Sequence, residues 1–535
     1  MELDPKRVDH LGVIAGTIRK LGMIDQIDNL LGTNEQNEVT TGEAVAAMII
    51  NGLGFANRVI SLTPQFFETK ALDVLLRQGI LSEHLNRHRL GRALDRIAEY
   101  GGEKLFTTLA LNACLKEHVH LKMLSGDVTS YSVTGEYDEE TDEHDIIIKH
   151  GYSKDHRPDL KQVVQDILSS QDGGIPIMTR IWPGNASDVE VLRERVNKLR
   201  ECFKDSHETR CMIADSKLYV RENIEHLNRI KFITRVPATI NMEQEVIKRA
   251  VAENAWQQID EKYCAQEFII NHYNVDQRWI VYKSGHAFER TKKTLGKIVK
   301  NELEEYNKKL FHLQADRFAC EADARKAVQK LVKKLKFHTL ENIELIVHGK
   351  HERPGRPNGE THSFIYQIKA SIVRSETAVE HQLIQRSCFV LTTNLKADEH
   401  DLTAILNFYK KQDLVEKSFA FIKDPKFFAS SLFLKNQQRL QGLLVIMTLA
   451  LLVYSLAQRH ARQQLAVLKS TIPNQINKPT ATPTLRWMFQ LLEGINYVYV
   501  KIDNDEKTVW TGITELRRRI IKLFYPEVQK IYQIS

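Results

Sequence analysis

Cysteine is scarce in this sequence, and the few cysteines present show no arrangement suited to metal binding. Six cysteines are spread over 535 residues, and no two of them form a CxxC pair. A structural zinc site would need closely spaced cysteines, and a small secreted domain held by disulfides would need a dense set. The 20 histidines also lack the spacing of metal ligands. We therefore expect reduced thiols in a cytosolic protein.

The sequence also lacks an apolar signal core and a clear membrane-spanning run. Its first residues, MELDPKRVDHLG, are too polar for a secretion signal. The most apolar stretch, Gly442–Ala457, is shorter than the roughly 20 residues that span a bilayer, and arginines flank it. We expect a buried core helix there, and a cytoplasmic protein without a membrane partner.

Charge of one sign is not in large excess, because the formal net charge is only +7. The hydrophobic fraction of 42% and the charged fraction of 27% are ordinary, which argues against long disordered regions. The length allows about three or four domains. Basic residues cluster only locally, in Arg290–Lys300, Arg325–Lys336 and Arg517–Lys522. Such clusters are compatible with nucleic-acid binding, although solvated helix faces cause them more often.

Residues 1–117 are predicted to form a helical N-terminal domain. Apolar residues recur at helical spacing within it, for example in Ala44–Leu53. Thr40 or Thr41 is a suitable N-cap for this helix, with Glu43 in its first turn. A local set of basic residues would suit a recognition module: Arg87, Arg89, Arg92 and Arg96. A dimerisation or packing domain fits the same pattern equally well.

Residues 118–237 are predicted to form the first part of a mixed α/β core. A β-branched and aromatic stretch, SGDVTSYSVTGEY, begins this region. Further strand and helix patterns follow at Gln162–Leu168, Ile175–Ile181, Ser187–Leu199, Arg210–Ala214 and Lys231–Val236. Three strands, a helix, a strand, a helix and a strand predict a mixed sheet.

Residues 238–387 interrupt this order and are predicted to form a large α+β insertion domain. Strand-like pieces alternate there with long charged helices. The second part of the core is predicted at 388–465, beginning with the strand Cys388–Thr393. Residues 466–535 are predicted to form a C-terminal helical region.

The stretch Tyr409–Lys423, YKKQDLVEKSFAFIK, predicts a helix with two different faces. At about 100° per residue, four polar side chains fall within roughly a 60° arc. These are Tyr409, Gln412, Glu416 and Lys423. An apolar stripe runs alongside them. The helix is therefore expected to pack on one side and to carry chemistry on the other.

Two aspartates are candidates to join Glu416 in a reactive site. Asp127 lies within the first predicted strand, where a lone carboxylate would be costly to bury. Asp215 directly follows the short strand at Arg210–Ala214. If those strands are neighbours, the two carboxylates converge and Glu416 completes an oxygen-only cluster. Mutual repulsion in such a cluster favours two Mg²⁺ ions, for which Mn²⁺ can substitute, and such ions activate phosphodiester chemistry.

With these residues in place, the chain resembles the DDE transposases of bacterial insertion sequences. It resembles specifically the branch with a Tyr-x2-Arg-x3-Glu-x6-Lys signature, matched here by Tyr409, Gln412, Glu416 and Lys423. Further matching pieces are GDVTSYSVTGEY, HGYSKDHRPDLKQ, PGNASD, IADSKLY and FITRVP. Their joint order is more specific than any single piece.

The resemblance implies a ribonuclease-H-like core that performs cut-and-paste DNA transposition. Asp127 would bridge both metal ions, and Asp215 and Glu416 would each hold one. The partners would be double-stranded DNA, as terminal inverted repeats and target, and a second copy in a synaptic homodimer. Residues 1–117 would then bind DNA ends or serve assembly. The resemblance also implies a bacterial cytoplasmic protein, nucleoid-associated when bound to DNA.

The resemblance implies DNA contacts as well. Tyr409 and Lys423 would hold terminal phosphates, whereas Gln412 departs from the arginine of the pattern and supplies no charge. Lys154 and Arg157 are interpreted as phosphate contacts, with a solvated basic loop as the alternative.

Two other functions fit the sequence. One is a catalytically inactive DNA-binding relic or repressor, against which the three intact acids argue. The other is a metal-dependent nuclease on the same core that cuts DNA without strand transfer. The insertion and the DNA-end residues count against this second alternative.

Overall fold

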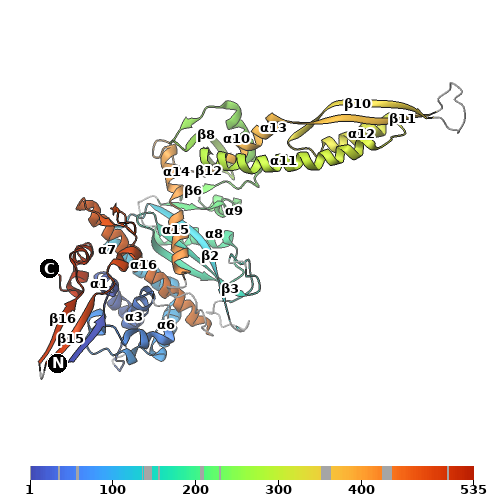
Figure 1. The fold of residues 1–535 in the computed structure, drawn as a ribbon. Coiled ribbons are helices and arrows are strands. Elements are labelled where there is room, and N and C mark those ends of the chain that lie inside the picture. Colours follow the sequence, from blue (N-terminus) through green and yellow to red (C-terminus); the bar gives the residue numbers. More distant parts are fainter. Residues whose placement is uncertain are drawn as a thin grey trace. The chain divides into compact units, whose positions relative to one another are not determined.

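The computed structural model divides the chain into two compact units, which are described separately. The first unit comprises Met1–Thr234 and Ala404–Ser535, and the second comprises Arg235–Thr403. Figure 1 labels their helices and strands. The structure describes residues 2–33, 36–55, 59–134, 137, 147–154, 157–204, 210–227, 230–350, 363–424, 436–502 and 505–534.

The N-terminal helices of the first unit surround one long apolar helix. The main ones are α1 (Leu11–Leu21), α2 (Met23–Leu31), α3 (Thr41–Leu53), α6 (Arg87–Tyr100) and α7 (Gly102–Lys116). Most of them pack on α16 (Gln437–Val467), which is long and apolar enough to cross a membrane but lies mostly buried within the protein. The buried core helix predicted at Gly442–Ala457 is thus confirmed.

The start of α3 shows how the sequence sets a helix boundary. The Glu43 N–H donates to Thr40 Oγ1 at 3.1 Å, and the Thr40 N–H donates to Glu43 Oε2 at 2.8 Å. This capping box satisfies two backbone donors that a helix start otherwise leaves without partners. The predicted N-cap is therefore confirmed at Thr40.

Two of the four N-terminal arginines donate to backbone carbonyls of segments far away in the sequence. Arg89 is buried and donates to the Val39 carbonyl at 2.7 Å. Arg96 donates to the Leu31 carbonyl at 2.9 Å. Arg87 and Arg92 are exposed. Half of the predicted basic group therefore joins loops to helices, which favours a packing role for these side chains.

Five neighbouring strands of a mixed sheet form the centre of the first unit. These strands are β2 (Met123–Val133), β3 (Lys161–Ser170), β4 (Ile175–Trp182), β5 (Cys211–Ala214) and β6 (Lys231–Arg235). They lie in the order β4-β3-β2-β5-β6. The first three strands pair antiparallel, whereas β5 pairs parallel with both β2 and β6. With the helices α8 (Asp188–Cys202) and α9 (Arg221–His226), this confirms the predicted mixed α/β order.

Residues near the two ends of the chain share a small sheet. The strand β1 (Glu2–Arg7) pairs with β15 (Asn496–Ile502), which pairs with β16 (Asp505–Thr511). The N-terminal region was predicted to be helical, and the C-terminal region was predicted to end in a helix, a strand and a helix. The segment ELDPKR contains no β-branched residue, so local propensity gives no signal for β1 and the strand depends on pairing with a distant partner.

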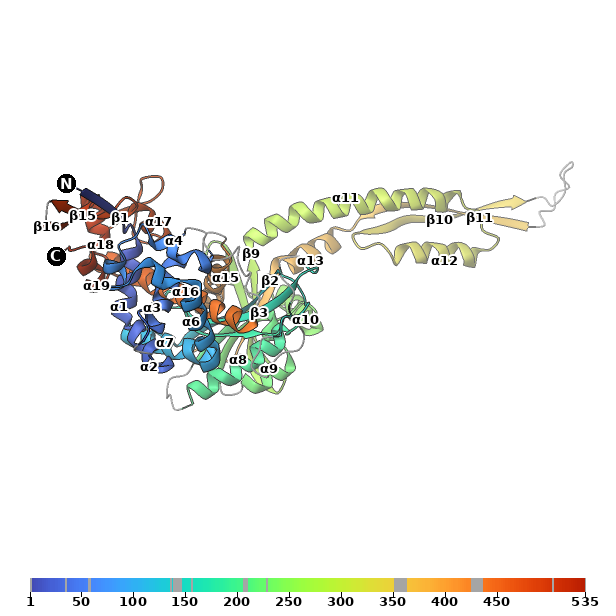
Figure 2. The same ribbon diagram turned by 90° about the horizontal axis from the view of Figure 1, so that it is seen from below.

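The second unit combines a sheet with a long ribbon. Four sheet strands of this unit lie in the order β12-β9-β8-β7, with β8 at Tyr263–His272 and β7 at Gln257–Gln258. Of these, β12 (Cys388–Thr393) and β9 (Val275–Ser284) pair antiparallel. The ribbon consists of β10 (His338–Lys350) and β11 (Ser363–Arg374). In Figure 2, α11 (Gly285–Ala315) and α12 (Glu321–Val332) flank this ribbon. Long charged helices and strands were both predicted here.

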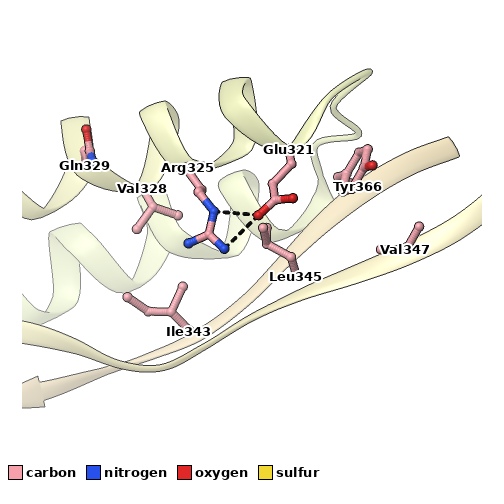
Figure 3. Close-up of a pocket in the computed structure, with 8 residues that line it drawn as sticks. All are labelled: Glu321, Arg325, Val328, Gln329, Ile343, Leu345, Val347 and Tyr366. Carbon is pink, nitrogen blue, oxygen red and sulfur yellow. Dashed lines mark hydrogen bonds and ion pairs between the residues drawn. The ribbon is translucent and has the colours of Figure 1, made fainter.

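A groove lies between α12 and one face of the ribbon. Ile343 and Val347 line its strand side and are about half exposed, while Arg325 and Glu321 form an ion pair at 2.7 Å on its helix side (Figure 3). The groove holds about 590 Å³. Nothing in its lining favours one ligand chemistry.

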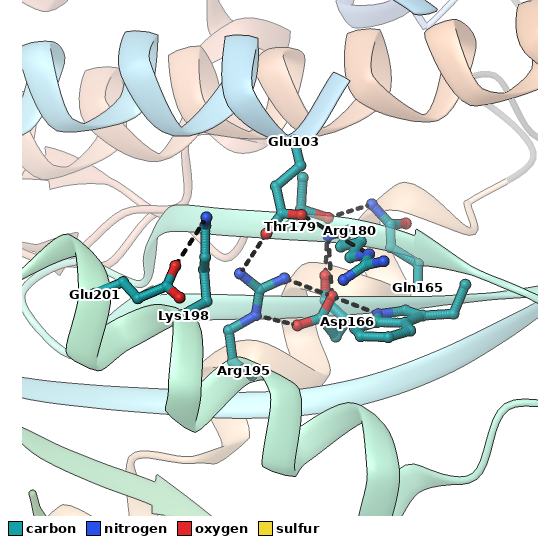
Figure 4. A network of polar contacts seen from close by, with 9 residues as sticks. Glu103, Gln165, Asp166, Thr179, Arg180, Arg195, Lys198 and Glu201 are labelled. Carbon is teal, nitrogen blue, oxygen red and sulfur yellow. Dashed lines mark hydrogen bonds and ion pairs between the residues drawn. The ribbon is translucent and has the colours of Figure 1, made fainter. Parts of the chain in front are cut away.

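A buried ion pair joins the sheet of the first unit to two helices (Figure 4). The carboxylate of Asp166 on β3 is paired with Arg195 of α8, and both side chains are almost fully buried. Arg195 also donates to Glu103 of α7 at 3.1 Å, and the Trp182 indole N–H donates to Asp166 at 3.0 Å. These contacts fix α8, which begins at Asp188, on the sheet.

The buried pair generates a stability prediction. Arg195→Met should lower the free energy of unfolding by about 3–5 kcal/mol, because it leaves the Asp166 carboxylate buried without its cation. Urea unfolding followed by tryptophan fluorescence measures this loss. Lys198→Met on the same helix is the control, since its exposed pair with Glu201 contributes less than about 1 kcal/mol. Equal losses in the two variants would contradict the prediction.

Candidate functional site

The register of β2 and β5 brings two of the predicted acids together. Ser125 pairs with Ile213 in the parallel ladder. Asp127 and Asp215 each lie two residues further along, and the backbone at Asp215 is still extended. Because side chains alternate along a strand, both carboxylates lie on the same face at the same level. Neighbouring strands are about 4.8 Å apart, so the two acids are close.

The surroundings of Asp127 disfavour its ionised form. Burial, together with the negative charges of Asp215 and Glu416, raises the pKa of Asp127 to about 6. The Val128 N–H donates to Asp127 Oδ1 at 2.7 Å and lowers the pKa, as does the charge of Lys154. The two raising charges belong to the other two predicted acids, so all three carboxylates act on one region.

Asp215 caps a short helix and also lies level with Asp127. It caps the short helix Ser216–Leu218 by accepting from the Lys217 N–H at 2.9 Å. Thr234 Oγ1 donates to its main-chain carbonyl at 2.7 Å, which ties it to β6. Burial raises the pKa of Asp215, and the charge of Asp188 raises it further. Capping therefore does not remove Asp215 from the acidic cluster.

The prediction of one continuous helix over Tyr409–Lys423 is wrong. The structure has two helices, α14 (Leu402–Lys410) and α15 (Asp413–Ile422). Between them, the N–H groups of Gln412, Leu414 and Val415 bond to carbonyls only three residues back. This shift from i−4 to i−3 bonding tightens the chain and ends the α-helical ladder. The proposed 60° arc therefore does not describe one helix face.

The two helices nevertheless carry the predicted residues. Glu416 is exposed on α15, which packs on β2, β3 and α16. Tyr409 is partly buried on α14, and Gln412 in the break is only 7% exposed. The Lys423 ammonium lies 5.3 Å from the centre of the Tyr131 ring on β2.

Lys154 lies among the carboxylates, where the sequence gave no reason to expect it. Its Nζ donates to the Val128 carbonyl at 2.5 Å and lies 3.2 Å from the Asp188 carboxylate. Asp188 follows Ser187, whose side chain caps α8. The PGNASD piece of the sequence indicates only a turn and a helix cap, so the contact between Asp188 and Lys154 was not predicted. The spacing of these two residues in the chain gives no signal for their contact.

Two glycines hold the segment that carries Lys154 against the sheet. A Cβ at Gly151 would lie 2.0 Å from the Gly184 carbonyl oxygen, and one at Gly184 would lie equally close to the Gln162 carbonyl. Only glycine permits such close approach of two backbones. The HGYSK and PGN pieces of the sequence therefore fix the position of Lys154.

The other predicted contact in this segment lies apart from the acids. Arg157 is exposed and donates to both carboxylate oxygens of Asp159, at 2.8 and 2.7 Å. Its charge is thus already offset within the loop. His156 of the same piece, and the acidic run Glu136–Asp145 apart from Tyr137, lie outside the described residues.

The donor set fits a hard divalent cation in its chemistry. Asp127, Asp215 and Glu416 offer only oxygen ligands, which Mg²⁺ and Mn²⁺ prefer. In the described part of the chain, however, no three His, Cys, Asp or Glu side chains are close enough to hold one ion together.

The chain is thus a mixed α/β protein with an acidic cluster beside its central strand. The family described as "Transposase DDE domain" matches residues 127–453, which is more than half of the chain and includes all three acids. The protein belongs to this family, and its general function is that of a DDE transposase. A second family, described as a domain of unknown function (DUF4277), matches residues 3–111.

The other comparisons add little. No curated protein matches the chain. One solved structure that is similar is the "Cryo-EM structure of piggyBac transposase synaptic complex with hairpin DNA", at 8% sequence identity. The match covers 99% of this chain and 84% of that chain with a TM-score of 0.38, which is too low to assign a fold.

The raised pKa of Asp127 generates a pH prediction for metal-free protein. An unfolded aspartate has a pKa near 3.9, so the folded state binds the proton more tightly. Protonation of Asp127 therefore stabilises the folded state below about pH 4, and this contribution is lost as the pH rises through about 6. Asp127→Asn mimics the protonated acid and should be more stable than wild type by about 3 kcal/mol at pH 7.5.

Urea unfolding in EDTA at pH 4 and pH 7.5 measures this difference. At pH 4 the two proteins should be equally stable, because the wild-type carboxyl is then protonated. A difference that does not change with pH would show that Asp127 ionises without the cost inferred from its surroundings.

Proposed function

We propose that this protein catalyses cut-and-paste transposition of a bacterial insertion sequence. It would cleave DNA at the terminal inverted repeats and join the released ends to target DNA, in a metal-dependent reaction. The observation that carries the proposal is the placement of Asp127 on β2 level with Asp215 directly after β5, with Glu416 on α15, which packs on β2. The family match over these residues supports it.

The strand order of the first unit supports a ribonuclease-H-like core. Three antiparallel strands are followed by two that run parallel to the central β2. In this core, Asp127 lies on the central strand and Asp215 at the end of its parallel neighbour. Residues 1–117 would form the DNA-end-binding or assembly domain, and 238–387 the insertion between the two core parts.

Asp127, Asp215 and Glu416 would hold two Mg²⁺ ions, with Asp127 shared. When bound, the ions would supply an activated oxygen nucleophile and stabilise the leaving oxygen of a phosphodiester. The chain itself supplies the rigid frame, because β2 and β5 fix two carboxylates and the packing of α15 on β2 delivers the third.

Before metal ions bind, Lys154 would offset part of the negative charge of the carboxylates. Its ammonium is bonded to the Val128 carbonyl and paired with Asp188, and its charge lowers the pKa of both Asp127 and Asp215. Contact with DNA would require the ammonium to exchange these partners for a phosphate oxygen. We therefore propose that Lys154 contacts a phosphate, and that its pairing with Asp188 positions it before DNA binds.

The remaining DNA contacts would lie beside the break between α14 and α15. Tyr409 precedes this break, and Lys423 follows α15 next to the Tyr131 ring. Gln412 is buried, so a neutral amide at this position suits the packing of the break. We propose Tyr409 and Lys423 as contacts to the terminal phosphates. Arg157 would have to leave Asp159 to contribute.

The protein would act on double-stranded DNA as a homodimer, because two element ends have to be brought together. Its site of action would be the bacterial cytoplasm, on the nucleoid when bound.

A cleavage and strand-transfer assay with Mg²⁺ tests the proposal on DNA that carries the inverted repeats flanking the gene. Asp127→Ala, Asp215→Ala and Glu416→Ala should each lower the rate at least 100-fold, because each removes a metal ligand, while DNA binding persists. Asp413→Asn is the control: it changes an exposed acid of the same helix that pairs with Lys417 at 2.6 Å, and should cut normally.

The products distinguish the alternative functions. Binding without cutting by wild type would indicate an inactive relic. Cutting without joined products would indicate a nuclease. Wild-type cutting by the three alanine variants would show that the acids are not the metal site.

A further inference from the structure

The first half of α11 presents a basic face to solvent. Arg290, Lys293, Lys297 and Lys300 are all exposed. Their spacing of three, four and three residues places them within an arc of about 80° along roughly 15 Å of helix. On the opposite side, Leu295 and Val299 are buried in a cluster with Phe337 and with residues of α13 (Glu376–Ser387). The orientation of this basic face is therefore fixed by the packing behind it.

The basic face keeps most of its charge. Within the described residues, no carboxylate lies at ion-pair distance from Arg290, Lys293 or Lys297, and Lys300 lies 3.9 Å from Glu304. On the neighbouring segments, in contrast, cations are paired with carboxylates. Lys309, further along α11, is paired with Glu305, and Arg325 on α12 is paired with Glu321. The first half of α11 is thus unlike the balanced surfaces beside it.

A glycine borders this face in the middle of the helix. Gly296 is exposed, and a Cβ at this position would meet no atom within 4 Å. Neither packing nor backbone conformation requires glycine here, and glycine weakens a helix interior relative to alanine. Its neighbours on the helix surface include Lys293 and Lys300, three and four residues away. Glycine at such a place leaves the helix backbone open to close approach by a ligand.

We propose that the phosphodiester backbone of double-stranded DNA docks across Gly296 and is held by Lys293, Lys297 and Lys300. This inference takes the class of partner, DNA, from the proposed function. What it adds is the surface that binds the DNA. Closely spaced cations on one face match the regular negative charge of a duplex, and the absence of a side chain at Gly296 lets a strand lie near the helix. The contact carries no base readout and is independent of sequence.

Fluorescence anisotropy with a 30-base-pair duplex lacking the inverted repeats tests the surface in the full chain. The triple variant Lys293→Gln, Lys297→Gln, Lys300→Gln should bind at least tenfold more weakly at 100 mM salt. The slope of log K against log salt should fall by about 0.9 for each lost phosphate contact. A matched control on α12 removes the same charge from three exposed lysines, and should keep the wild-type slope: Lys326→Gln, Lys330→Gln, Lys333→Gln.

Substitutions at Gly296 separate docking from helix stability. Gly296→Ala should raise the thermal unfolding temperature, because alanine favours the helix. Gly296→Gln adds bulk without charge, and should weaken duplex binding at least threefold without lowering that temperature.

The outcomes distinguish two failures. If wild type binds neither this duplex nor DNA that carries the inverted repeats, the proposed function fails together with this surface. If wild type binds only DNA that carries the inverted repeats, the surface alone is wrong. If wild type binds and the α11 triple variant behaves like the α12 control, or Gly296→Gln binds like wild type, the surface alone is wrong.

Discussion

Repulsion between carboxylates at the central strand is the constraint on which the rest of the site depends. Burial raises the pKa of Asp127 to about 6, and the charges of Asp215 and Glu416 add to this rise. A frame that holds such groups together is unfavourable by itself, so it needs positive charge. In the metal-free protein Lys154 supplies part of that charge, and Asp188 holds Lys154 in reach. A centre of this kind gains stability when divalent cations bind.

The surrounding fold resists this repulsion. Parallel pairing of β5 with β2 sets the two aspartates level, and the Asp166–Arg195 pair fixes the helix that begins at Asp188. Close backbone approach at Gly151 fixes the segment that carries Lys154. The apolar helix α16 packs on the N-terminal helices, on β4 and on α15, so it supports both the sheet and the helix that carries Glu416. Core packing and site geometry therefore depend on the same elements.

Local patterns predicted the fold where chemistry acts within a few residues. The capping box at Thr40, the buried helix α16 and the order of the core strands follow from such patterns. Local patterns did not predict the structure where it depends on contacts that the patterns do not encode. Pairing with β15 makes β1 a strand, and i−3 hydrogen bonding ends α14 where helical periodicity continues. The three acids and Lys154 could be selected from sequence, but the contact between Lys154 and Asp188 depends on the approach of a loop to a helix start.

Titration calorimetry of Mn²⁺ into the DNA-free protein tests the central claim most directly, because it needs neither substrate nor turnover. The account predicts that Asp127→Asn abolishes binding, while Asp215→Asn and Glu416→Gln each weaken it at least tenfold. Lys154→Met should bind Mn²⁺ at least as tightly as wild type, since it removes a competing cation. Wild-type affinity in Asp127→Asn would contradict the account, because the carboxylate common to both ions would then play no part in holding them.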